Sequence, residues 1–229
     1  KQASKVYDQL LKIEPFNQDF QIEKAEILIY LKKYSGAIAI FDKLEKKLGI
    51  LAEIILQKQK LYLAQGKYDA AEKEMQRLID AFPNEPEYYG MFAEFYLNIN
   101  KKEKAMNMFQ KVLELDPNNP IIHLAMASYY QENNQSDKAF EHIKLAFNNP
   151  EVELDNKIKI MLSYYDLSAN NSQRKKEAEE LLDILVLVHP AEPKTWSVKG
   201  DFLLRDGRLD EAIAAYEKVI ELQNDKYPV

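Results

Sequence analysis

The chain has 229 residues, and 46% of them are hydrophobic, which is enough to bury a core and excludes a chain disordered by composition. It contains no cysteine, so disulfide bonds, thiol catalysis and thiolate metal sites are excluded. With only six glycines and a net charge of −6, we expect neither glycine-lined phosphate loops nor a dedicated nucleic-acid binder.

Two helix-length amphipathic segments alternate along the chain with a period of 34 residues. The period is marked by alanines that are each followed, four and seven residues later, by larger or apolar side chains. These alanines are Ala3, Ala37, Ala71, Ala105, Ala139, Ala178 and Ala212. The step before Ala178 is 39 residues, which implies an insertion of five.

In chain order, the period predicts a lone second helix followed by six helix pairs. The predicted segments are 1–17, 18–51, 52–85, 86–119, 120–153, 154–192 with the insertion, and 193–226, with 227–229 as the start of another repeat. Pro86, Pro120 and Pro193 are placed to open the first helix of a pair, where the missing N–H costs nothing. We expect the insertion to form an extended, solvated turn within SANNSQRKK.

The segment PKTWSVKGDFLLRDGRLDEAIAAYEKVIEL resembles a tetratricopeptide repeat. The family positions are filled by Trp196, Gly200, Leu203, Gly207, Leu209, Ala212, Tyr216 and Val219. The resemblance covers essentially the whole chain. It implies an all-α protein, a right-handed α-solenoid of antiparallel helix pairs with about six and a half units in one superhelical domain. It also implies a scaffold that binds proteins.

Two repeats depart from the pattern: residues 154–192 carry the insertion and have Met161 at position 8, where a small residue is expected, and residues 52–85 differ at two positions. Residues 52–85 carry Lys58 and Gln59 at positions 7 and 8, where a large apolar and a small residue are expected, so we expect the first helix of this pair to pack less tightly. We expect Gln59 to be a satisfied polar residue. The glycine at position 8 of the last repeat, Gly200, should permit close packing of the two helices.

Few residues suggest chemistry. The three histidines, His123, His142 and His189, show no i, i+4 ligand spacing, and the carboxylates are spread over all the helices. We therefore expect no enzyme activity, no metal and no cofactor. No apolar run is long enough to cross a membrane, so we expect no membrane insertion of this segment.

In the family, an extended or helical peptide commonly lies in a concave groove lined by positions 2, 5, 6, 9, 12 and 13 of the first helices. The resemblance therefore implies candidate groove residues Glu23, Glu26, Tyr30, Glu53, Gln57, Lys60, Glu87, Gly90, Glu94, Asn98, Ser128, Gln131, Tyr165, Asp201 and Arg205. The first three pairs present an acidic surface, so we expect a basic or apolar segment as ligand. The Lys, Asn and Arg pattern of the repeats that clamp chaperone C-termini is absent.

Gly90 is unusual among these residues, because a glycine inside a helix costs about 1 kcal/mol relative to alanine. Close approach of a ligand or of a neighbouring side chain would explain it. A tolerated weak spot is the simpler alternative.

Two other functions stay open: a self-assembly module, with homodimers formed through exposed terminal repeats, and a regulatory arm of a larger protein. The sequence begins at Lys1 without Met, so we interpret it as an internal fragment of a larger protein. Its composition resembles bacterial proteins made of many such repeats. That resemblance favours a periplasmic or envelope location, with the cytoplasm as the alternative.

Overall fold

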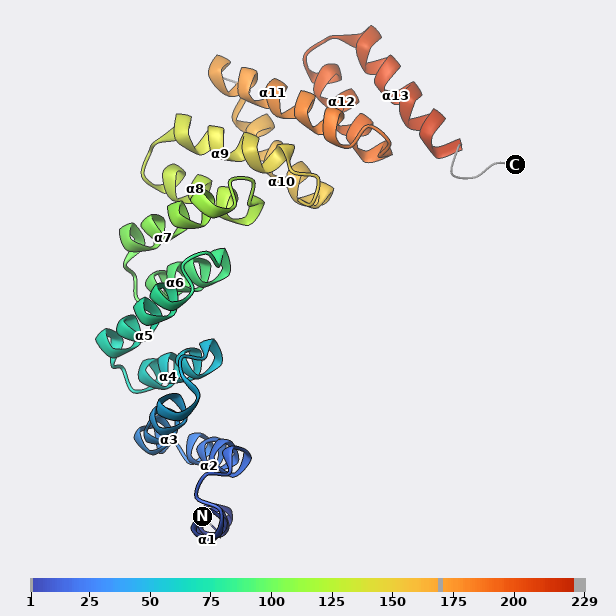
Figure 1. The fold of residues 1–229 in the computed structure, drawn as a ribbon. Helices are drawn as coiled ribbons and strands as arrows, with labels where there is room; N and C mark the ends of the chain where they lie inside the picture. The colour runs from blue at the N-terminus through green and yellow to red at the C-terminus, as the bar shows by residue number, and fades with distance from the viewer. Residues whose placement is uncertain (1, 169–170, 225–229) are drawn as a thin grey trace. The chain divides into compact units, whose positions relative to one another are not determined.

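A computed structural model describes residues 2–168 and 171–224, and these residues form thirteen helices and no strand. The helices are α1 (Gln2–Ile13), α2 (Gln18–Tyr30), α3 (Tyr34–Leu48), α4 (Ala52–Ala64), α5 (Tyr68–Ala81), α6 (Pro86–Asn98), α7 (Lys102–Leu115), α8 (Pro120–Glu132), α9 (Ser136–Asn148), α10 (Leu154–Ser168), α11 (Ser172–Val188), α12 (Pro193–Arg205) and α13 (Leu209–Asn224). The expected all-α solenoid of antiparallel helix pairs is confirmed (Figure 1).

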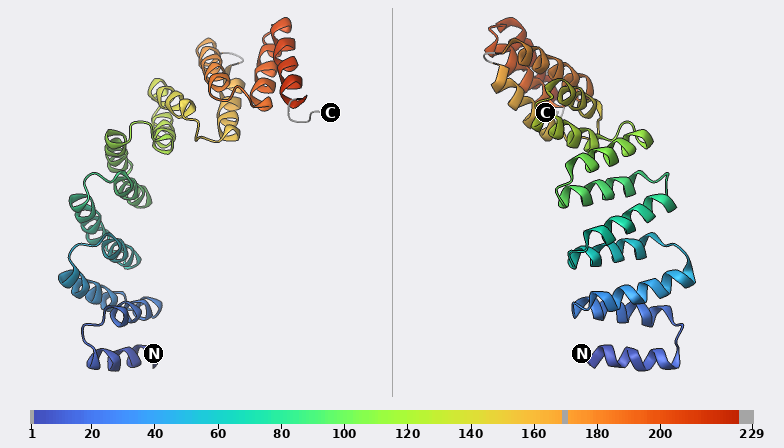
Figure 2. Two further views of the ribbon diagram at one scale, coloured as in Figure 1. Left: turned by 45° about the vertical axis from the view of Figure 1, so that its right-hand side comes forward. Right: turned by 90° about the vertical axis from the view of Figure 1, so that its left-hand side faces the viewer.

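The helices form two compact units, residues 1–115 with α1 to α7 and residues 116–229 with α8 to α13. In both units each even-numbered helix packs most extensively on the odd-numbered helix that follows it, as Figure 2 shows for α2 and α3. We call the two members of a pair its first and second helix. The start of a further repeat predicted at 227–229 lies outside the described residues.

Helix starts and turns recur at fixed positions of the repeat. Pro86, Pro120 and Pro193 are the first residues of α6, α8 and α12, as expected. The turn inside each regular pair has a left-handed residue, which lets the next backbone N–H return to the helix just ended. These residues, all at position 15, are Lys32, Gly66, Asn100, Asn134 and Gly207.

Small residues allow the helices of a pair to approach closely. The in-phase alanines from Ala37 to Ala212 are at most 2% exposed, whereas Ala3 in α1 is exposed. Around them the large apolar side chains form a core in each unit, with Phe41 and Leu44 in the first and Phe147 and Leu181 in the second. A single pair cannot bury such a face alone, so stacking of pairs supplies the core.

The residues expected to form an extended turn at the insertion are instead helical at Ser168 and at 172–176, while residues 169–170 lie outside the described part of the chain. α10 has 15 residues, two more than the other first helices, and α11 begins six residues before Ala178 instead of three. These extensions account for all five inserted residues. Helix extension satisfies backbone N–H and C=O groups that an extended turn would leave to water.

Candidate functional site

The candidate groove residues all lie on first helices, and their side chains are mostly exposed. Only Gly90 and Tyr165 are half-buried, and Tyr30 is 87% exposed. Along a helix, positions 2, 5, 6, 9, 12 and 13 share one side. We call this exposed side of the first helices the groove face and describe it within each unit.

In the first unit, the groove face contains a hollow of about 330 Å³ between α4, α5 and α6. Leu56, Lys60 and Leu63 line it from α4, and Glu94 and Asn98 line it from α6. Met75 of α5 and Met91 of α6 also line it. With Gln59 of α4 also in the lining, the hollow combines apolar side chains with one cation, one carboxylate and two amides.

The second unit has a corresponding hollow of about 370 Å³ between α8, α9 and α10. Its lining includes Leu124, Ser128 and Gln131 from α8 and Ile143 from α9. These residues occupy positions 5, 9, 12 and 24 of their repeat, which are the positions of Leu56, Lys60, Leu63 and Met75 in the first unit. The repeat thus forms the same kind of hollow twice, with different polar groups.

The carboxylates on the groove face of the first unit have no partner among the described residues. They are Asp19, Glu23, Glu26, Glu53, Glu87 and Glu94. By contrast, Glu72 on the second helix α5 bonds to Tyr96, Lys101 and Lys104, and the hydrogen bond from Lys104 is the main cause that lowers its pKa to about 2. Tyr88 lies among the groove carboxylates: burial, then the charges of Glu87 and Glu53, raise its pKa.

Three predicted groove residues near the end of the chain contact one another instead. The guanidinium carbon of Arg205 lies 3.2 Å from the centre of the Tyr165 ring, and the guanidinium donates a hydrogen bond to the Tyr165 backbone carbonyl. The Tyr165 hydroxyl bonds to the backbone carbonyl of Asp201 at 3.4 Å, and the Asp201 side chain accepts from Tyr216. These contacts join α10, α12 and α13.

Comparison with known proteins identifies the repeat. Sequence profiles described as tetratricopeptide repeat match residues 60–85, 86–119, 108–141 and 168–227, together more than half of the chain. The chain is a tetratricopeptide repeat protein. The repeats support a scaffold for protein–protein interaction.

Individual relatives are distant. A TPR repeat-containing protein of Methanocaldococcus jannaschii is 38% identical over 66 residues, which are 29% of this chain and 17% of the relative's length. A tetratricopeptide repeat protein from Parabacteroides merdae matches in structure with a TM-score of 0.50 and 14% identity, over 96% of this chain and 85% of that one. The C-terminal part of a Cytophaga hutchinsonii TPR repeat-containing protein matches with a TM-score of 0.49 and 17% identity, over 88% of this chain and 78% of that one.

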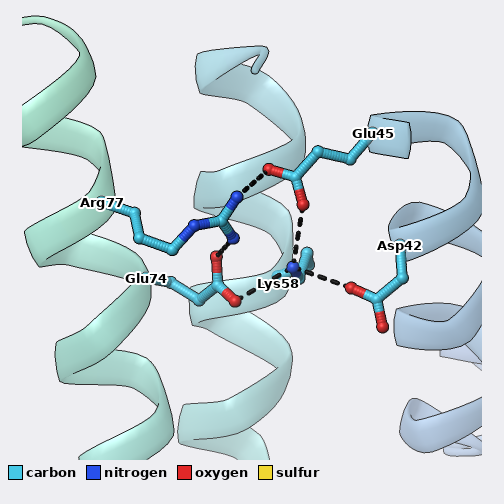
Figure 3. Close-up of polar contacts among 5 residues, drawn as sticks. All are labelled: Asp42, Glu45, Lys58, Glu74 and Arg77. Carbon is cyan, nitrogen blue, oxygen red and sulfur yellow. Dashed lines mark hydrogen bonds and ion pairs between the residues drawn. The ribbon is translucent and has the colours of Figure 1, made fainter. Parts of the chain in front are cut away.

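The tetratricopeptide repeat with Lys58 contains a polar cluster that the sequence did not reveal (Figure 3). Lys58 and Gln59 are 3% and 7% exposed, so the expected loosening of this helix has not opened it to solvent. The Lys58 ammonium lies 2.8 Å from Asp42, 3.1 Å from Glu45 and 3.0 Å from Glu74, and Arg77 bonds to both glutamates. We call these five residues the Lys58 cluster; it joins α3, α4 and α5.

The electrostatics of the Lys58 cluster favour its charged forms. Burial alone would lower the pKa of Lys58, but its hydrogen bonds to Asp42, Glu74 and Glu45 outweigh burial and raise it. Burial likewise opposes ionisation of Glu45, and the hydrogen bonds from Arg77 and Lys58 lower its pKa in spite of it. The cluster is therefore held together by charge.

All three histidine side chains make polar contacts. His123 Nε2 lies 2.9 Å from the Pro117 carbonyl, which can only accept, so His123 Nδ1 is free to accept from His142 Nδ1 at 2.9 Å. Burial, and then His123, lowers the pKa of His142. In the part of the chain that the structure describes, no group of three or more His, Asp and Glu side chains could hold a metal ion.

A second buried lysine, in the second unit, was likewise not predicted from the sequence. Lys157 is 0% exposed, and its ammonium donates to the Asn149 carbonyl at 2.9 Å and contacts His189 Nε2 at 2.8 Å. Burial lowers the pKa of Lys157 to about 8. Position 4 of this repeat thus carries a polar side chain that joins the end of one pair to the end of the next.

We expect Gly90→Ala to raise the free energy of unfolding by up to about 1 kcal/mol, because the structure leaves open space within 4 Å of an added Cβ and alanine is the better helix former. No neighbouring side chain lies close enough to Gly90 to require a glycine there. Urea denaturation followed by circular dichroism measures the change. A loss of stability would contradict this prediction, and a stable variant that no longer binds its ligand would give Gly90 a role in binding.

Proposed function

We propose that this tetratricopeptide repeat protein is a non-catalytic scaffold whose groove face binds a basic or apolar segment of a partner protein. The observation that carries the proposal is the difference between the two kinds of helix in residues 1–115. Most carboxylates on second helices, such as Glu45, Glu72 and Glu74, are engaged by lysines and arginine, whereas the groove carboxylates, such as Glu53 and Glu87, have no hydrogen-bond or ion-pair partner among the described residues.

Unpartnered carboxylates beside an apolar hollow suit a ligand that carries both lysine or arginine and aliphatic side chains. The hollow between α4, α5 and α6 offers Leu56, Leu63 and Met91 for the aliphatic part, with Glu94 beside them. Complementary charge at such a rim mostly steers association and selects partners. The binding should therefore weaken as salt increases.

The test compares two charge variants. We expect Glu53→Gln/Glu87→Gln to weaken binding of a fluorescein-labelled peptide of lysine and leucine by about threefold to tenfold, since exposed ion pairs contribute roughly 0.2–1 kcal/mol each. The matched control is Asp69→Asn/Glu103→Gln, which removes two charges from the first turns of the second helices α5 and α7. Both Glu53 and Glu87 also lie in first turns, so effects on helix stability are matched.

Fluorescence anisotropy at low and high salt measures the affinities. An equal loss in the two variants would show that net charge alone acts, and preference for a glutamate–leucine peptide at the groove face would contradict the proposal. An unlabelled lysine–serine peptide of equal charge measures how much the apolar contacts add.

A further inference from the structure

Helix α3 sorts its charged side chains onto two sides. Asp42 and Glu45 point toward Lys58 of α4, as Figure 3 shows. Lys43 and Lys47, four residues apart, lie on the other side, and Lys46 lies between the two sides, four residues from Asp42. Asp42 and Glu45 are thus paired within the Lys58 cluster, and the lysines make the rest of the α3 surface basic.

This basic face borders a hollow of about 600 Å³ between α1, α2 and α3, which we call the basic hollow. Four lysines line it, Lys24, Lys43, Lys46 and Lys47. Apolar side chains line it as well, with Leu11 from α1, Ile40 from α3 and Phe16 from the connection between α1 and α2. Phe16 is 74% exposed, which is unusual for a phenylalanine and leaves its ring available for contact.

Two of the four lysines are available to a ligand. Lys24 pairs with Asp8 at 2.6 Å, and Lys47 donates to the Phe16 carbonyl at 3.1 Å with its ammonium 5.3 Å from the ring centre. Lys43 and Lys46 are exposed and have no hydrogen-bond or ion-pair partner among the described residues. Two free ammonium groups and an exposed ring thus border one hollow.

We propose that the basic hollow binds an acidic peptide segment that carries an aliphatic or aromatic side chain. Its carboxylates pair with Lys43 and Lys46, and its apolar side chain packs on Phe16 and Ile40. The volume suits a few side chains. A long polyanion is disfavoured, because the whole chain carries a net charge of −6 and the nearby groove face is acidic. The site has the opposite charge preference from the groove face and does not depend on it.

The probe is a labelled peptide of alternating glutamate and leucine, titrated against the full 229-residue chain by fluorescence anisotropy. We expect Lys43→Glu/Lys46→Glu to weaken its binding by about tenfold or more, since it replaces two attractions by two repulsions. The matched control is Lys67→Glu/Lys73→Glu, which changes net charge equally at two exposed lysines of the same unit and should change affinity less than about twofold.

A second variant, Phe16→Ala, tests the apolar contact without changing charge. It should weaken the glutamate–leucine peptide about threefold or more and leave a weak glutamate–serine peptide unaffected. Because Phe16, Lys43 and Lys46 are exposed, each variant should keep the circular dichroism spectrum of the parent chain.

The proposal is overturned by equal losses in the two lysine variants, by no binding of the peptide, or by anionic vesicles or an oligonucleotide binding the hollow more tightly than the peptide does. Glu53→Gln/Glu87→Gln should leave the acidic peptide's affinity unchanged or slightly increased. The proposal for the basic hollow and the proposal for the groove face can therefore be refuted independently of each other.

Discussion

Lys58→Met should lower the free energy of unfolding by about 3–5 kcal/mol, the cost of removing one partner of a buried ion pair. Methionine preserves most of the stem's packing, so the loss reports on the charge. Without Lys58, Glu45 and Glu74, whose side chains are 12% and 9% exposed, share only Arg77. Two largely buried carboxylates would then face one partly exposed cation.

The matched control lies on the same helix. Lys60→Met, two residues along α4, replaces an exposed lysine and should change stability by no more than about 0.5 kcal/mol. Urea denaturation gives the global values, and native-state hydrogen exchange of α3, α4 and α5 shows whether the loss is local to the Lys58 cluster.

The pH dependence follows from the direction of the two shifts. The raised pKa of Lys58 contributes stability that is fully present below pH 10.5, the ordinary pKa of lysine, and is lost as pH rises through the folded-state pKa. The lowered pKa of Glu45 contributes stability that is present above pH 4.5, the ordinary pKa of glutamate, and is lost as pH falls through the folded-state pKa. The parent cluster is therefore fully formed between these values. In Lys58→Met the carboxylates lose their cation, so the deficit should be smaller at about pH 5 than at about pH 7.5.

A rescue variant identifies the mechanism. Lys58→Met/Glu45→Gln/Glu74→Gln removes the unpaired charges together with the cation and should recover more than half of the lost stability. A Lys58→Met protein within about 1 kcal/mol of the parent, or a deficit that does not change with pH, would contradict the electrostatic account.

The repeat period predicted the places of the helices because small residues, prolines and apolar residues each have a steric reason to recur. First helices begin at residues 18, 52, 86, 120, 154 and 193, where the period places them. The partners of Lys58 did not follow from the period, since they depend on rotamers that bring side chains from three helices to one point. One signal was present: Lys58 and Asp42 are separated by 16 residues, and so are Lys24 and Asp8, which form the corresponding pair one repeat earlier.

The candidate groove residues could be placed on first helices for the same periodic reason, but their contacts could not. Tyr165, Asp201 and Arg205 bond among themselves because α10 and α12 stack, and neither the spacing nor the residue types distinguish this from a free surface. The insertion before Ala178 was misassigned because charged residues such as those in SQRKK suit a solvated turn and an exposed helix start equally well.

Gly200→Ala should lower stability by about 1–3 kcal/mol, the opposite sign from the same substitution at Gly90. An added Cβ at Gly200 would lie 2.5 Å from Tyr216 Cε1 and 2.7 Å from Cζ, whereas at Gly90 it meets nothing within 4 Å. The ring cannot yield cheaply, because the Tyr216 hydroxyl donates to Asp201 at 2.6 Å, a bond that raises the pKa of Tyr216 to about 12.

The single tryptophan, Trp196, packs in the same small core as Tyr216 and Ala212, so its fluorescence in a urea titration reports directly on α12 and α13. Tyr216→Phe keeps the ring over Gly200 but frees it from Asp201, so it should relieve the clash only in part, whereas Tyr216→Leu removes the ring. In a double-mutant cycle, Gly200→Ala should cost at least about 1 kcal/mol less in the Tyr216→Leu background than beside the native tyrosine. Equal costs on both backgrounds would mean that the ring does not require the glycine, and that Gly200→Ala acts through the backbone alone.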